Sequence, residues 1–142
     1  MANISQLLDL KGREVVSVKP DDTVLTALQL MERDNVGSLV VMDGQRLVGI
    51  FSERLYARNV FLKGKAAPNT TIREVMNDKV VIARPGNTVQ ECMAIMTEKR
   101  VRHLPVLDGD ELVGIISIGD LVKSIISDQK FTIEQLESYI HS

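Results

Sequence analysis

Two segments of the chain place apolar residues at the spacing of one helix face. Thr23 precedes the first set and Thr88 precedes the second, and a threonine at this point can cap a helix. The apolar positions are Val24, Ala27, Leu28 and Met31 in the first segment and Val89, Cys92, Met93 and Met96 in the second. Their recurrence at i, i+3, i+4 and i+7 predicts two amphipathic helices.

Each predicted helix is followed by two apolar runs of strand length. The runs cover 36–42 and 47–51 in the first segment, and 104–107 and 112–116 in the second. An Asp-Gly pair separates the runs in both cases, which indicates a hairpin. Pro105 cannot donate to a strand ladder, so we expect it at a strand end or edge.

Short β-prone runs, 15–18 and 80–83, precede the two predicted helices, and a further helix is expected after Ser52 and after Ser117. Each segment therefore predicts the order β-α-β-β-α. The two segments are copies of one repeat, because a shift of 65 residues aligns 15–58 with 80–123 without a gap, and 16 of 44 aligned positions are identical.

The segments outside the repeats carry helix and linker signals. Lys63–Asn69 is polar with Gly and Pro, as linkers often are. Thr71 and Glu74 predict a capping box for a short helix through Met76, and 132–135 predicts another box that opens a last helix. The predicted organisation is repeat one in 1–62, a linker in 63–70, repeat two in 71–128 and a C-terminal helical segment in 129–142.

Composition limits the class of protein. The 142 residues, 44% hydrophobic and 25% charged, suit one medium domain or two very small ones and exclude a whole catalytic barrel. The formal net charge of −2, without long charged runs, disfavours nucleic acid as a partner. No apolar stretch reaches the length of a membrane span or a secretory signal, and a single cysteine builds no disulfide framework. We expect a cytoplasmic protein that does not contact a membrane.

The usual signatures of catalysis and metal binding are missing from the sequence. Two histidines, His103 and His141, and the lone Cys92 give no zinc spacing, so we expect no metal site. The chain contains no phosphate-binding glycine loop and no Gly-x-Ser-x-Gly nucleophile elbow. We therefore expect no catalytic residues, no required cofactor and no enzymatic activity. Cys92 lies on the apolar helix face and is expected to be an inert core thiol.

Paired motifs at constant offset resemble a tandem pair of CBS domains, also called a Bateman module. The motifs are Pro20-Asp21-Asp22-Thr23-Val24, 36–41, 49–54, Arg102-His103-Leu104-Pro105-Val106 and 114–120. The chain looks most like small stand-alone bacterial proteins with two CBS domains. The resemblance implies an α/β (α+β) fold in which two β-α-β-β-α repeats are related by pseudo-twofold symmetry, with an added C-terminal helix.

The resemblance also implies a ligand. Many CBS pairs bind AMP, ADP, ATP, and in some cases NAD or S-adenosylmethionine, in two clefts between the repeats. The family motif ends in Ser/Thr-x-x-Asp, which repeat two carries as Ser117-Ile118-Gly119-Asp120. Repeat one has Leu55 at the position of the ribose-binding carboxylate, which puts its cleft in doubt.

The chemistry of the residues suggests a role for each candidate. A carboxylate accepts hydrogen bonds from both hydroxyls of a ribose diol, which suits Asp120. Arg54, Arg102 and His103 are candidates for the phosphates, together with the Ser117 hydroxyl and the helix N-terminus behind it. The adenine would contact aliphatic side chains such as Ile82, Val101, Pro105 and Ile116. The remaining members of the candidate set are Ser38, Ser52, Ile118 and Gly119.

Structural interpretations of these residues stay open beside the functional ones. Ser117 and Asp120 form a helix-capping pair by pattern, His103 can be a half-buried histidine bonded to a carbonyl, and the arginines can be solvated. The leading hypothesis is a regulatory module that binds an adenine nucleotide, pairs as a homodimer and acts on an unidentified effector protein. The alternative is a ligand-free interaction module that works through dimerisation and its C-terminal helix. An enzyme related to inosine monophosphate dehydrogenase is disfavoured, because that chemistry resides in a barrel absent from this chain.

Overall fold

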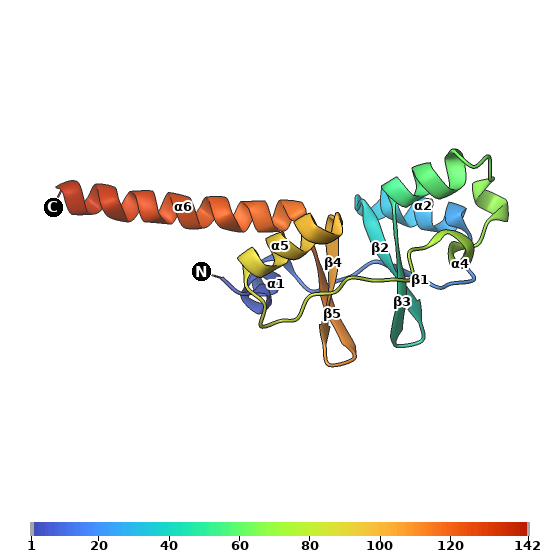
Figure 1. The fold of residues 1–142 in the computed structure, drawn as a ribbon, viewed down its shortest axis with the longest axis horizontal. Coiled ribbons are helices and arrows are strands. Elements are labelled where there is room, and N and C mark those ends of the chain that lie inside the picture. The colour runs from blue at the N-terminus through green and yellow to red at the C-terminus, as the bar shows by residue number, and fades with distance from the viewer. Residues whose placement is uncertain (1, 142) are drawn as a thin grey trace. The chain divides into compact units, whose positions relative to one another are not determined.

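The computed structural model describes residues 2–141, and the chain divides into two compact units (Figure 1). Unit 1 comprises Met1–Arg13, Val81–Asp108 and Val113–Ser142, whereas unit 2 comprises Glu14–Val80 and Gly109–Leu112. Both units are built from segments that are separated in the sequence, and each is described by itself.

Unit 2 is organised around a three-stranded sheet in the order β1-β2-β3. The strand β1 (Ser17–Val18) pairs in parallel with β2 (Ser38–Asp43), which pairs antiparallel with β3 (Arg46–Ser52). The remaining elements of this unit are α2 (Val24–Asp34), α3 (Glu53–Tyr56), the π-helix η1 (Ala57–Phe61), the 3-10 helix η2 (Ala67–Asn69) and α4 (Ile72–Val75). The core includes Phe51, Leu39 and Ile72, all with no exposed surface.

Unit 1 contains a two-stranded sheet of β4 (His103–Asp108) and β5 (Glu111–Ser117), whose first two residues are counted with unit 2. Its helices are α1 (Ile4–Lys11), α5 (Val89–Lys99) and α6 (Ile118–His141). Leu8, Leu104, Ile116 and Leu121 are completely buried in its core. No helix within residues 2–141 combines the length and the apolar character needed to span a membrane.

The predicted repeat is confirmed by local geometry that recurs at the same offset of 65 residues. Thr23 and Thr88 cap α2 and α5 by accepting a hydrogen bond from the backbone three residues on. Both helices end at a left-handed residue, Asn35 with φ of 51° and Arg100 with φ of 55°. Both hairpins turn at a glycine of positive φ, which favours the residue without a Cβ.

The prediction of a strand at 80–83 is wrong, since this segment forms only a parallel bridge between Ala83 and Val106. In unit 2 the amide of Val40 donates to the carbonyl of Val16 at 3.1 Å, which extends the β1 ladder. The residue that corresponds to Val40 is Pro105, which has no N–H to donate. Pro105 lies inside β4, on the edge of the sheet that faces this bridge, and its carbonyl accepts from Ala83.

The prediction that a separate helix begins at Thr132 is also wrong, because α6 continues without interruption from Ile118 to His141. The Thr132 hydroxyl donates to the carbonyl of Asp128 at 3.0 Å, one turn back along the same helix. No Gly or Pro follows Gly119 in this segment, so nothing ends the helix between the two predicted elements.

Two helices outside the repeats complete the units. The helix α1 precedes repeat one in the sequence but packs in unit 1, where Asn3 bridges to Thr88. The helix α4 packs in unit 2, where Thr71 bridges to Thr23.

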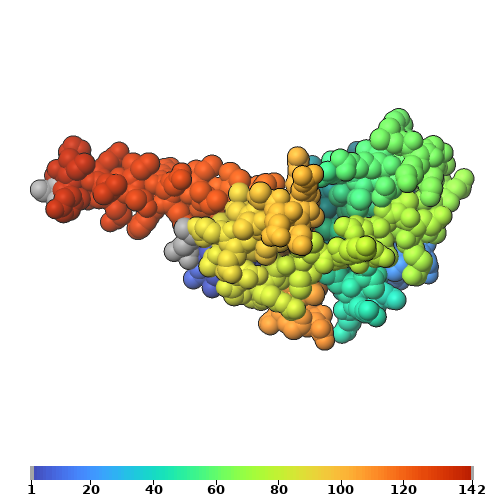
Figure 2. All heavy atoms as spheres, viewed as in Figure 1, coloured from blue at the N-terminus to red at the C-terminus, as the bar shows by residue number. Residues whose placement is uncertain are grey.

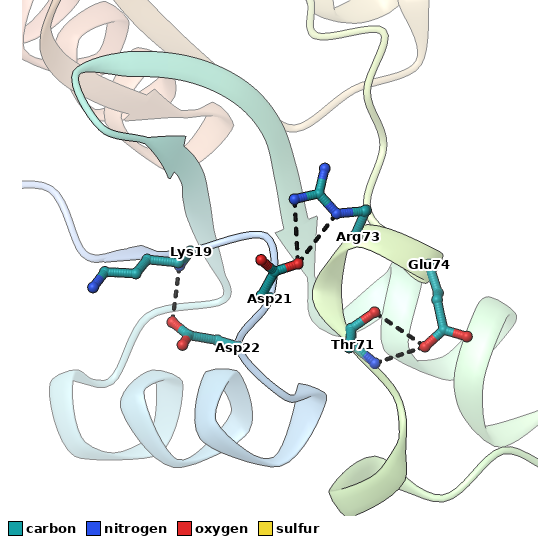
Figure 3. Close-up of polar contacts among 6 residues, drawn as sticks. All are labelled: Lys19, Asp21, Asp22, Thr71, Arg73 and Glu74. Atoms are coloured by element: carbon teal, nitrogen blue, oxygen red, sulfur yellow. Dashed lines mark hydrogen bonds and ion pairs between the residues drawn. The ribbon is translucent and has the colours of Figure 1, made fainter.

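Figure 3 shows how α4 is fixed to the segment before α2. The capping box predicted for Thr71 and Glu74 is confirmed, with the Thr71 amide donating to the Glu74 carboxylate at 2.8 Å. In the same view Arg73 forms an ion pair with Asp21, at 3.2 Å between Nη2 and Oδ1. The helix ends at Val75, one residue before the predicted end.

Candidate functional site

The junction of β5 and α6 is organised by reciprocal hydrogen bonds between Ser117 and Asp120. The Ser117 amide donates to Asp120 Oδ2 at 2.8 Å, and the Asp120 amide donates to Ser117 Oγ at 3.2 Å. The helix-capping interpretation of this pair is therefore confirmed. The cap fixes the position of the carboxylate at the first turn of a 24-residue helix, where a negative charge is favoured by the helix dipole.

A lysine from α1 reaches the same carboxylate. Lys11 Nζ donates to Asp120 Oδ2 at 2.6 Å and to the carbonyl of Ile115 at 2.7 Å. Burial alone would raise the pKa of Asp120, but the hydrogen bonds from Lys11 and from the Ser117 amide, together with the lysine charge, lower it below its ordinary value. The carboxylate is therefore ionised at neutral pH. Both bonds use Oδ2, and Oδ1 accepts no hydrogen bond from residues 2–141.

Arg102 and His103 lie beside this junction. The carbonyl of Arg102 accepts from the amide of Ile118, the first residue of α6, at 2.9 Å. The Arg102 side chain is exposed, and His103, the first residue of β4, is half-buried. A cation near the start of α6 is thus available on a segment whose backbone is fixed to the helix.

The predicted adenine contacts differ in their accessibility. Ile82 and Val101 are half-buried, and Pro105 is buried. Ile116 has no exposed surface and packs in the core of unit 1 with Leu104. The assignment of Ile116 as an adenine contact is therefore wrong, because inward-facing positions of β5 belong to the core.

The corresponding junction in unit 2 has the same backbone but different side chains. Ser52 Oγ accepts from the amide of Leu55 at 3.2 Å, and the amide of Glu53 donates to the carbonyl of Gly37 at 3.1 Å. Leu55 packs against the core of unit 2 where unit 1 has Asp120. This junction therefore has the cap but no carboxylate at the position that corresponds to Asp120.

The other candidates of unit 2 are two residues near this cap. Ser38 is buried and is the strand partner of Ser52, whereas the Arg54 side chain is exposed. The structure thus brings together Ser117–Asp120, Arg102 and His103 in unit 1, while Ser38, Ser52 and Arg54 lie in unit 2.

Sequence reasoning missed Lys11, since it assigned no helix to the first residues of the chain. A signal was present: Asn3 and Gln6 form a capping box for α1, with bonds of 3.0 and 2.9 Å. The contact itself joins residues 109 positions apart, so no local pattern could identify it.

The thiol and the metal chemistry add little to the site. Cys92 is buried as predicted, and burial raises the pKa of its thiol to about 11, which keeps it protonated. Among residues 2–141, no three His, Cys, Asp or Glu side chains are grouped closely enough to hold a metal ion.

The family model for the CBS domain matches residues 8–57 and 72–127. Among curated proteins, the mitochondrial CBS domain-containing protein CBSX3 of Arabidopsis thaliana is 32% identical over 146 residues. That alignment covers 96% of this chain and 71% of the plant protein.

Solved structures agree with this fold. A protein with CBS domains from Burkholderia ambifaria MC40-6 is 46% identical, with a TM-score of 0.86, over 90% of this chain and 96% of that one. Hypoxic Response Protein I, whose structure contains two coordinated zinc ions, is 25% identical, with a TM-score of 0.73, over 87% of this chain and 99% of that one.

Proposed function

Because the chain belongs to the CBS-domain family and carries two CBS domains, we propose that it is a non-catalytic regulatory module that binds an adenine nucleotide at the β5–α6 junction. CBS-domain pairs are generally regulatory or sensor modules. Ligand occupancy would be converted into a change of shape or of affinity for an effector protein, which requires that the two states bind the nucleotide differently.

The observation that carries the proposal is the state of Asp120. Its carboxylate is ionised, is held in place by a cap and a lysine, and keeps Oδ1 without a hydrogen bond among the described residues. An acceptor-only group suits the hydroxyls of a ribose. A ribose hydroxyl can therefore bond to Oδ1 while Lys11 and Ser117 hold Oδ2.

Positive charge near the same helix start supports a phosphorylated ligand. The exposed Arg102 can form a bidentate interaction with phosphate oxygens, and Lys11 has side-chain exposure of 32%. Aliphatic surface for the base is offered by Ile82 and Val101, both half-buried. The candidate ligands are AMP, ADP and ATP, with NAD or S-adenosylmethionine as further members of the class.

A thermal-shift panel tests the proposal. We expect one of these adenylates, at about 100 times its Kd, to stabilise the purified protein by about 2.7 kcal/mol, and to raise its Tm by several degrees. Asp120→Ala removes the proposed ribose acceptor, and Asp120→Asn keeps a capping oxygen but loses the charge. Both should abolish the rise, measured from each variant's own ligand-free Tm.

Asp110→Ala is the matched control, since Asp110 is an exposed carboxylate in the β4–β5 turn and its loss should leave the rise unchanged. A rise that persists in both Asp120 variants would place the nucleotide elsewhere and refute the site. The absence of any rise in the wild type would refute the sensor.

A ligand-free interaction module is the second candidate function. Leu55 occupies the carboxylate position of unit 2, so only one of the two junctions has the acceptor. The second half of α6 also exposes large apolar side chains, which favours contact with another protein. In this case Asp120→Ala would leave partner contacts intact.

A further inference from the structure

No element of unit 1 packs on the C-terminal half of α6 (Figures 1 and 2). This half of the helix has exposed apolar side chains. Earlier in the helix, Leu121 is buried and Ile125 packs against the core of unit 1. From Gln129 to His141 every residue is exposed. Isolated helices of this length are marginal in water, so an uncovered apolar face of this kind is typical of a helix that pairs.

Five of the eight large apolar side chains exposed on α6 follow the seven-residue repeat of a coiled coil, with the polar Gln129 at a sixth position. The repeat positions form one stripe, here called the seam: Val122, Ile126, Gln129, Ile133, Leu136 and Ile140. Successive members are alternately four and three residues apart, which is the a/d spacing. Ile126, Ile133 and Leu136 are each between 55 and 58% exposed. The seam is centred about 110° around the helix from the face that packs on unit 1, so unit 1 does not cover it.

We propose that the seam is a homodimerisation surface on which α6 of a second copy packs antiparallel, in the register that pairs Ile126 with Leu136 of the second copy. In this register every seam residue faces another across the pair. The remaining layers are Val122 with Ile140 and Gln129 with Ile133, each formed twice by symmetry. A shift of one heptad in either direction would keep four of the six layers.

The charges beside the seam agree with the antiparallel orientation. Lys123, Lys130 and Glu137 occupy the flanking e positions. In an antiparallel pair the e positions of the two helices face one another, so Lys123 lies near Glu137 of the second copy, twice per dimer. The two Lys130 side chains approach each other at the centre of the pair, and their repulsion offsets part of the stabilisation by these ion pairs. In a parallel pair, Ile125 would lie beside Lys130 of the second copy and Thr132 beside its Glu137, so no ion pair would form.

The same helix does not suit a membrane surface. It carries two lysines and four carboxylates, a formal net charge of −2, whereas helices that bind anionic bilayers are rich in lysine and arginine. In the antiparallel pair, the globular parts of the two copies lie at opposite ends of the paired helices. The free half of each α6 then covers Val122 and Ile126 of the other.

Cysteine cross-linking tests the register directly, and it does not depend on other interfaces. Ile126→Cys and Leu136→Cys are made separately in the full chain, one of them with a short tag so that mixed and self products differ in mass. The native Cys92 is completely buried and stays in place. After mild oxidation we expect a disulfide in the mixture, between the tagged and untagged chains, and little in either variant alone.

Two results would overturn the pairing. Disulfides within each variant alone would mean a parallel pair, and no disulfide in any sample would mean that the seam is free or that a different partner covers it. Ile133→Lys should halve the molar mass measured by light scattering. Circular dichroism would show whether the variant keeps its helix content. Phe131→Lys is its control, because Phe131 is 64% exposed but lies outside the seam. An equal loss in both variants would contradict the assignment.

A charge reversal gives an independent measure of orientation. Lys123→Glu alone should weaken self-association severalfold, and the double variant Lys123→Glu with Glu137→Lys should restore it. A double variant as weak as the single one would refute the antiparallel register. The inference does not rest on nucleotide binding: the thermal-shift panel tests Asp120, and the cross-links test the seam.

Discussion

Lys11 connects the first helix of the chain to the start of the last one, and its replacement by Met tests what that contact contributes. Met keeps most of the apolar stem but removes the bonds to Asp120 and to the carbonyl of Ile115. Hydrogen bonds to charged groups contribute about 1.5–3 kcal/mol when well buried. Side-chain exposure of 32% for Lys11 and 21% for Asp120 lets water replace part of this. We expect a loss of about 1–2 kcal/mol in the free energy of unfolding, or about 3–8 °C in Tm.

The loss should depend on pH in a defined direction. The folded protein holds the pKa of Asp120 below its ordinary value of 3.8, so the folded state binds a proton less readily than the unfolded state. The stabilisation by this ionised carboxylate is fully present above about pH 4, and it is lost as the pH falls through the lowered pKa. Urea denaturation at pH 7 and at the lowest pH where the wild type stays folded should therefore show a smaller effect of Lys11→Met in acid.

A double-mutant cycle separates this ion pair from other effects of the substitution. In an Asp120→Asn background, Lys11→Met should lose most of its effect, because the charged partner is already gone. Lys63→Met is the matched control, since Lys63 is exposed and forms no ion pair within residues 2–141. An equal loss with and without the Asp120 carboxylate would refute the assigned coupling, and so would a loss at pH 7 no larger than that of the control.

Two further predictions concern the core of unit 1. Gly114→Ala should destabilise the protein by about 1–3 kcal/mol, because the added Cβ would lie 2.7 Å from Cδ2 of Leu8. Gly119→Ala is the control and should be close to neutral in thermal unfolding, since its added Cβ would meet nothing nearer than 3.6 Å. Equal losses of stability in the two variants would contradict the packing argument. Cys92 should not react with a thiol reagent at pH 8 in the native protein and should react fully in denaturant, since its thiol is buried and its pKa is about 11. Rapid labelling of Cys92 in the native protein would contradict this and would show that the buried face of α5 opens.

The local elements of the fold could be predicted from the sequence because their signals are local. Threonine caps, the Asp-Gly hairpins and the spacing of apolar residues each act within a few positions, and Thr23, Thr88 and Gly44 behave in the structure as these patterns indicate. The strand predicted at 80–83 failed because of Pro105, which is distant in sequence, whereas the error at Thr132 arose where one local signal competed with another. Thr132 has the pattern of a cap, yet an uninterrupted helix precedes it, and its hydroxyl bonds back to Asp128 instead.

The candidate site was predictable only in part, for a reason that lies in the topology. The repeat covers 15–58 and 80–123, whereas the helices that complete the two units, α1 and α4, lie outside it. A comparison of the repeats alone therefore identifies Asp120 and the missing carboxylate at Leu55 but not the lysine beside Asp120.

The helix α1 precedes repeat one in the sequence, and it packs in the unit of repeat two, where Leu8 fills the space above Gly114. In unit 2 Met76 contacts Gly49 in the same way, and the amide of Asn77 donates to the carbonyl of Ile50 at 3.0 Å. The carbonyl of Ile115, at the position that corresponds to Ile50, accepts from Lys11 Nζ instead. A backbone donor in one unit is thus replaced by a charged side chain in the other, and that side chain is long enough to reach Asp120 as well. The charge pair at the candidate site is therefore a consequence of which helix completes which unit.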